Sequence, residues 1–151
     1  MRLVALAFLG KANEPLLFYS ADQQAGSELA ITQQLVFFSA LDVVDERRKK
    51  ALASAPSTFD LYLGQVLQMD DYKVFGHYSN THIKTLVLCD SATEAGDASV
   101  REVVLNFRNM YANAVQNPFL SVEKGQIDSN NKLSKAIVEA FTNNNNKGIS
   151  R

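Results

Sequence analysis

The sequence contains one cysteine, no apolar run as long as a membrane span, and no excess of either charge. The lone Cys89 excludes an internal disulfide framework and is typical of a reducing compartment. A membrane-spanning helix needs about 20 consecutive apolar residues, and no segment approaches that length. With 15 basic and 16 acidic side chains, the net charge is −1, so no overall field favours nucleic acid or an anionic membrane. We therefore expect a cytosolic protein that does not bind nucleic acid.

Motifs for catalysis, metal binding or cofactor binding are also missing. The sequence has no glycine-rich phosphate loop, no His-Glu-x-x-His, no Cys-x-x-Cys and no Gly-x-Ser-x-Gly. His77 and His82 flank a short turn and could face each other across a hairpin, but a metal would need further ligands. Cys89 has the opposite strand parity to His82 and is better explained as a buried apolar residue than as a nucleophile. We expect no enzyme activity, no cofactor and no metal; a small enzyme using both histidines remains an alternative.

The remaining composition is that of one globular domain. The chain has 151 residues, of which 46% are apolar and 21% charged. Its first ten residues, MRLVALAFLG, superficially resemble a signal peptide, but polar residues follow from Lys11 to Glu14. An opening β-strand explains the same pattern better. We expect a domain over residues 1–142, followed by a disordered asparagine-rich tail over residues 143–151.

Apolar periodicity predicts the order β-β-α-β-β-β-α-α. Strands are expected over residues 2–10, 16–20, 59–68, 72–79 and 82–90, and helices over about 28–52, 97–117 and 128–141. The second helix carries the clearest core-facing pattern: Val100, Val103, Val104, Phe107, Met110, Tyr111 and Ala114. Short links between strands favour an antiparallel sheet with helices packed on its faces, which is an α+β fold.

The first helix is unusual because it is apolar on two sides. With Leu41 at zero and about 100° per residue, its main apolar face also contains Asp45 near 40° and Asp42 near 100°. A second stripe gathers near −100° to −160° and consists of Leu29, Val36, Ala40 and Val43. Since a surface helix needs only one apolar side, we expect a partner protein to cover the second stripe.

Two explanations of the aspartates stay open at this point. In the first, Asp42 caps the backbone of a neighbouring loop, or the helix breaks near Ser39 and exposes both acids. In the second, one acid anchors a partner or orders a loop that meets it. A carboxylate inside an apolar face must be paired or hydrogen-bonded, so either role would explain its presence.

Two further segments have a plain and a functional explanation. The basic run Arg47–Lys50 could bind lipid or an acidic partner, but basic residues also suit the C-terminal end of a helix. Asn117-Pro118-Phe119 matches a short peptide motif that binds endocytic adaptor domains, but it also reads as a helix stop followed by a core aromatic. We favour the plain explanation for both segments.

Several fragments follow one another in order within residues 3–141: Leu41-Asp42-Val43-Val44-Asp45-Glu46, Tyr62-Leu63-Gly64, Asp71-Tyr72-Lys73-Val74-Phe75-Gly76, Asn80-Thr81 with Ile83-Lys84, Asn117-Pro118-Phe119, and Ile127 with Ser129. Together they resemble the sedlin-like small subunits of TRAPP, the transport protein particle. The resemblance implies a longin-like fold, in which a five-stranded antiparallel sheet carries one long helix on one face and two on the other.

The resemblance also implies a function. It indicates a non-catalytic adaptor or assembly subunit of a vesicle-tethering complex in ER–Golgi and Golgi traffic, which activates a Rab GTPase. Its partners would be other TRAPP subunits, and it would meet membranes only through the complex. Another longin-type module, such as a small clathrin-adaptor subunit or a SNARE regulatory domain, is the alternative.

Overall fold

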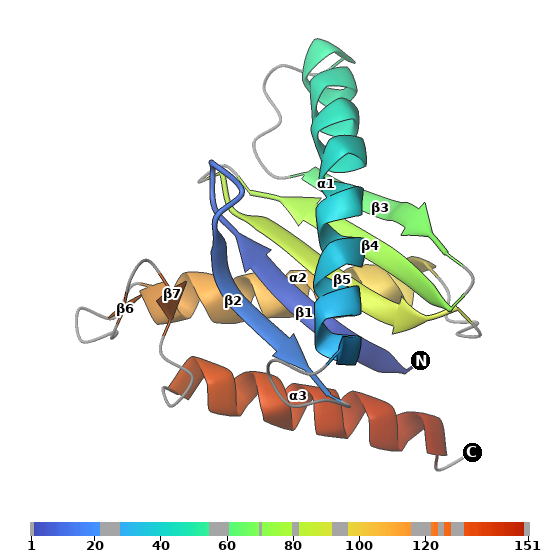
Figure 1. Ribbon diagram of the computed structural model, residues 1–151, viewed down its shortest axis with the longest axis vertical. Helices are drawn as coiled ribbons and strands as arrows, with labels where there is room; N and C mark the ends of the chain where they lie inside the picture. Colours follow the sequence, from blue (N-terminus) through green and yellow to red (C-terminus); the bar gives the residue numbers. More distant parts are fainter. Residues whose placement is uncertain are drawn as a thin grey trace.

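The computed structural model describes residues 2–21, 28–54, 61–69, 71–79, 82–91, 97–115, 122–123, 126–127 and 132–149. Five strands form an antiparallel sheet in the order β2-β1-β5-β4-β3: β1 (Leu3–Leu9), β2 (Pro15–Ser20), β3 (Leu61–Gln68), β4 (Tyr72–Tyr78) and β5 (Lys84–Asp90). Helix α1 (Glu28–Ser54) lies on one face, and α2 (Asp97–Val115) and α3 (Lys132–Ile149) pack on the other (Figure 1). The predicted α+β class and layer arrangement are confirmed.

Strand β1 lies inside the sheet, between β2 and β5, and is buried on both faces. Leu3, Leu6 and Phe8 belong to the core beneath α2 and α3, whereas Val4 and Leu9 belong to the core beneath α1. A strand covered on both faces has no need of alternating polar residues, so it reads as a continuous apolar run. This explains the opening sequence that superficially resembles a signal peptide.

The β4–β5 hairpin begins its second strand later than predicted. β5 starts at Lys84, which pairs with Tyr78. Two residues earlier, His82 has a positive φ of 65°, and its N–H donates to the Ser79 carbonyl at 3.0 Å. A positive φ is incompatible with an extended strand, so His82 belongs to the turn.

Edge strand β3 is irregular. Its register with β4 shifts between Tyr62 and Gly64 and again between Gln65 and Leu67. Gly64 has φ 71°, which an L side chain adopts only with strain. Two shifts within eight residues bend the strand, a common way in which proteins protect a sheet edge from pairing with another chain.

Helices α2 and α3 enclose the second core. Val100, Val104 and Phe107 from α2 meet Ile137 and Phe141 from α3 against the sheet. The four other predicted α2 residues pack around this cluster: Val103, Met110, Tyr111 and Ala114. The 3.6-residue spacing therefore placed α2 correctly. Two short strands that the sequence did not predict, β6 (Val122–Glu123) and β7 (Gln126–Ile127), pair with each other between the two helices in the chain.

The C-terminal segment differs from the predicted disordered tail. Helix α3 continues through the asparagine run and ends at Ile149. The Asn145 side chain forms two hydrogen bonds with the backbone of Leu3 at the start of β1. A polar segment can be ordered without burying apolar surface when its side chains satisfy backbone groups elsewhere, a contact that composition alone does not reveal.

Candidate protein–protein interface

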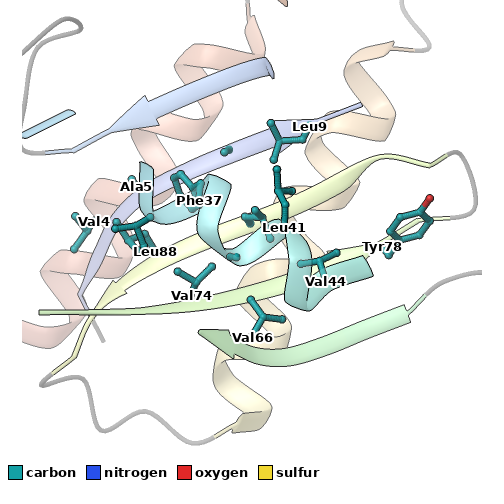
Figure 2. Close-up of a cluster of buried hydrophobic side chains, with 14 residues drawn as sticks. Val4, Ala5, Leu9, Phe37, Leu41, Val44, Val66, Val74, Tyr78 and Leu88 are labelled. Atoms are coloured by element: carbon teal, nitrogen blue, oxygen red, sulfur yellow. The ribbon is translucent and has the colours of Figure 1, made fainter. Parts of the chain in front are cut away.

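Helix α1 packs on the sheet through a face different from the one its sequence suggests. Its buried side chains are Gln33, Val36, Phe37, Ala40, Leu41 and Val44, and the apolar members join Val66, Val74 and Leu88 of the sheet (Figure 2). Taking about 100° per residue from Leu41, these side chains span an arc from about −140° to 0°. Leu41 therefore marks one edge of the buried arc and not its centre.

This arrangement corrects the interface predicted on the second stripe. Val36 and Ala40 are 5% and 0% exposed and belong to the core, and Val43 is partly buried against the same cluster. The side chain of Leu29 lies outside the described residues. Val36 and Ala40 are internal because the sheet, and not a second protein, covers them.

The opposite side of α1 exposes three large apolar side chains. Ile31, Leu35 and Phe38 are 51%, 60% and 47% exposed. Their spacings of four and three residues align them on one side of the helix, and Asp42 follows four residues later and is also exposed. We call these four residues the outer α1 face. A row of exposed apolar side chains on a helix marks a candidate contact surface.

The two aspartates that share this part of the helix have different surroundings. Asp45 Oδ1 lies 3.8 Å from Lys84 Nζ, and the Lys84 side chain is only 3% exposed whereas that of Asp45 is 42% exposed. Asp42 is exposed and forms no ion pair with any residue that the structure describes. Asp45 therefore contacts a buried ammonium within the domain, whereas Asp42 is exposed at the surface.

Lys84 joins three segments that are distant in the sequence. Its ammonium group contacts Asp45 of α1, donates a hydrogen bond to Asn13 Oδ1 of the β1–β2 turn, and lies 5.9 Å from the centre of the Tyr78 ring on β4. The backbone of Asn13 has a positive φ of 63° in the turn where its side chain accepts the Lys84 hydrogen bond. A buried ammonium needs such partners, since an unpaired buried charge is costly.

The basic run at the end of α1 is largely engaged within the domain. Arg47 Nη1 donates to the Leu63 carbonyl of β3 at 2.7 Å, and the Arg48 guanidinium lies 4.4 Å from the centre of the Tyr78 ring. Lys50 pairs with Glu46 at 3.1 Å, one turn earlier. These contacts support the plain explanation of the run as a helix end. The Asn117-Pro118-Phe119 segment lies outside the described residues.

The two histidines do not form one site. His77 is 1% exposed on β4, where it faces the same side as Phe75, toward α2. The neighbouring Tyr78 faces α1, and its hydroxyl hydrogen-bonds His82 Nδ1 at 2.9 Å. Within the described part of the chain, no group of three His, Cys, Asp or Glu residues could hold a metal ion. The suggestion that the histidines face each other across the hairpin is wrong, because His77 faces α2 whereas His82 lies in the turn, hydrogen-bonded to Tyr78 on the α1 side of the sheet.

Cys89 is a buried core residue beneath α2 and α3. Burial raises the pKa of its thiol from the usual 9.0 to about 12, despite the opposing effects of the N-terminal ammonium and of Lys73. A thiol reacts as the thiolate, so this group is unreactive near neutral pH. The sequence-based assignment of Cys89 to the apolar core is confirmed.

Sequence reasoning missed the outer α1 face because it treated the arc through Leu35 and Phe38 and the arc through Phe37 and Val44 as one apolar face. The positions of the aspartates could have separated the two arcs. The arc that includes Asp42 near 100° also includes Phe38 near about 60° and Leu35 near about 120°, and an acid without a partner belongs on the solvent side. Between Gln33 and Val44, the other arc, through Val36 and Ala40, contains no charged residue.

The chain is similar to proteins of known family. The family model described as Sedlin matches residues 8–143. A trafficking protein particle complex subunit 2-like protein of Dictyostelium discoideum is 26% identical over 145 residues, covering 94% of this chain and 95% of the relative. The proteins of the same name from Mus musculus and Rattus norvegicus are 32% and 30% identical over 117 residues, covering 77% of this chain and 81% of each relative. Among the helices in the described residues, none is both long and apolar enough to cross a membrane.

Proposed function

Because the chain belongs to the sedlin family, we propose that it is a subunit of a TRAPP vesicle-trafficking complex. The names of its relatives and the extent of the match support this assignment. Within that assembly the chain binds other TRAPP subunits and acts indirectly on a Rab GTPase. It meets ER or Golgi membranes only as part of the complex.

The chain's role in this proposal is that of a non-catalytic adaptor. Its chemically capable side chains are dispersed: His77 is buried under α2, His82 is hydrogen-bonded to Tyr78, and Cys89 is an inert thiol in the core. An active site needs such groups within hydrogen-bond reach of one another and of a substrate. We therefore propose that the chain acts by burying part of its surface against partner proteins.

The outer α1 face is the observation that carries the adaptor role. Three adjacent, roughly half-exposed apolar side chains on one helix, Ile31, Leu35 and Phe38, supply the apolar centre of a docking site. Asp42 lies at the end of the row and offers a charge at the rim. Rim charges set specificity and the association rate more than they add affinity.

Affinity purification from cells tests this role. Leu35→Asp combined with Phe38→Asp removes the apolar row at two exposed positions, so the protein should fold normally but recover few or no TRAPP subunits. Val138→Asp is the matched control, because Val138 is 42% exposed on α3, on the other face of the sheet. Its recovery should equal that of the wild type.

Thermal melts of the same variants separate binding from folding. The proposed interface is contradicted if the folded double variant still recovers every TRAPP subunit at wild-type yield. TRAPP membership itself fails if the wild-type chain recovers none of them. Asp42→Ala and Asp42→Tyr then define the contribution of the rim charge, with the expectation that both variants fold and that Tyr weakens recovery more than Ala.

A further inference from the structure

The side chain of Asn145 imitates a strand residue at the edge of β1. The Leu3 N–H donates to Asn145 Oδ1 at 2.8 Å, and Asn145 Nδ2 donates to the Leu3 carbonyl at 3.2 Å. A carboxamide has one acceptor and one donor in the arrangement of a peptide group, so it satisfies both backbone groups of one strand residue. The two residues are 142 positions apart in the sequence.

Among the described residues, β2 does not extend far enough to pair with Leu3. The pairing of β2 with β1 ends at Ser20, opposite Ala5, and the last backbone bond beyond it joins the Ala21 N–H to the Val4 carbonyl at 2.9 Å. On its other side, Leu3 pairs with Cys89 of β5. Asn145 therefore occupies the position that one further residue of β2 would hold.

The end of α3 depends on the same contact. Residues 143–146 are four consecutive asparagines, and Gly148 follows. Asparagine and glycine are weak helix formers, so intrinsic propensity does not favour helix here. Upstream, α3 is held by Ile137 and Phe141, whose ring lies 4.8 Å from that of Tyr19. Asn145 is the next anchor along the helix, one turn beyond Phe141.

We propose that Asn145 is a latch that closes the sheet edge at Leu3 and holds the last turns of α3 in helical form. The start of β1 and the last turns of α3 order together when the latch closes, and they open together while the rest of the domain stays folded. The inference extends beyond membership of a TRAPP complex and does not depend on it. It describes a conformational device that couples helix α3 to strand β1.

Residue-resolved amide hydrogen exchange on the full chain tests the latch. Propensity alone predicts that Asn145→Ala strengthens the helix, because alanine is the better helix former. The latch predicts the opposite sign: exchange at Leu3 and over residues 143–149 should become roughly tenfold faster, because two hydrogen bonds are lost. Exchange in β4 and β5 should not change.

Asn143→Ala is the matched control, since Asn143 is exposed on the same segment of α3. It should slow exchange over residues 143–149 and leave Leu3 unchanged. Asn145→Asp keeps an acceptor for the Leu3 N–H but loses the donor, so its effect should be intermediate at Leu3. The latch is overturned if Asn145→Ala behaves like Asn143→Ala, or if it accelerates exchange uniformly through all five strands.

Discussion

Two aspartates three residues apart on α1 have different surroundings, from which we expect different roles. Asp45 neutralises Lys84, whose side chain is 3% exposed, while Asp42 lies on the exposed side of the helix. The difference follows from what each carboxylate meets. The β4–β5 hairpin brings a buried ammonium to Asp45, whereas no described basic group pairs with Asp42. One turn of helix thus separates an internal contact from a surface one.

Replacing each aspartate by asparagine should separate these roles in chemical denaturation. Asp45→Asn should lower the free energy of unfolding by about 1 kcal/mol, below the usual cost of breaking a fully buried pair, because Asp45 is partly solvated. Asp42→Asn should change it by less than about 0.5 kcal/mol, as is usual for surface substitutions. Adding Lys84→Met to Asp45→Asn removes the unpaired ammonium and should recover part of the loss. Equal effects of the two single variants would contradict the assignment.

Cys89 should make the domain less stable in alkali. The folded thiol has a pKa of about 12, whereas the unfolded thiol titrates near 9.0. Between these pH values the unfolded state has lost the thiol proton that the folded state still binds. The contribution of this thiol to the free energy of unfolding is therefore fully present below pH 9 and is lost as the pH rises. The loss from this group approaches about 1.4 kcal/mol per pH unit. Burial also raises the pKa of Tyr111, which acts in the same direction.

Denaturation curves between pH 8 and pH 11 should show this decline. Cys89→Ala is the control: it lowers stability at pH 8 through the cavity it leaves, but its curve should fall less steeply above pH 9. Parallel curves for the two proteins would exclude a contribution from the thiol.

At the scale of elements, α1 shows how far sequence reasoning reached. The length and position of the helix were predictable, as were the five strands of the sheet and the inward face of α2. The phase of α1 was not, because its apolar side chains occupy two arcs and either could face the sheet. Tertiary contacts decide between them, because Ala40 and Val44 pack in one cluster with side chains of β4 and β5. The approach is close at Gly76 of β4, where an added Cβ atom would lie 3.7 Å from a Val44 methyl carbon. Likewise, composition could not reveal that Asn145 finds a backbone partner at Leu3.

Neighbouring positions on α1 test this phase directly. Val36→Asp places a carboxylate in the core and should cost at least about 3 kcal/mol or prevent folding, because Val36 is 5% exposed. Leu35→Asp, one residue away at 60% exposure, should keep the melting temperature within a few degrees of the wild type. If both variants fold equally well, α1 does not pack as described.

At the scale of the whole molecule, the sheet leaves one helix with an open apolar side. Helices α2 and α3 pack against each other as well as against the sheet, so each covers part of the other. Among the described helices, α1 is the only one on its face of the sheet, and its C-terminal turns project beyond the sheet (Figure 1). A solitary helix has solvent on its outer side. Apolar side chains on that side become buried only when another molecule covers them.

Oxidative footprinting of the isolated chain and of the affinity-purified complex should locate that molecule. In our proposal, side-chain oxidation at Leu35 and Phe38 falls severalfold on assembly, because a partner excludes solvent from the outer α1 face. Val138 of α3, with a similar exposure of 42%, serves as the internal reference and should keep its oxidation rate. Protection of Val138 without protection of Phe38 would move the interface to the opposite face of the sheet. Protection of both would mean that partners cover the domain on two sides, and the proposal that the outer α1 face alone binds partners would then be wrong.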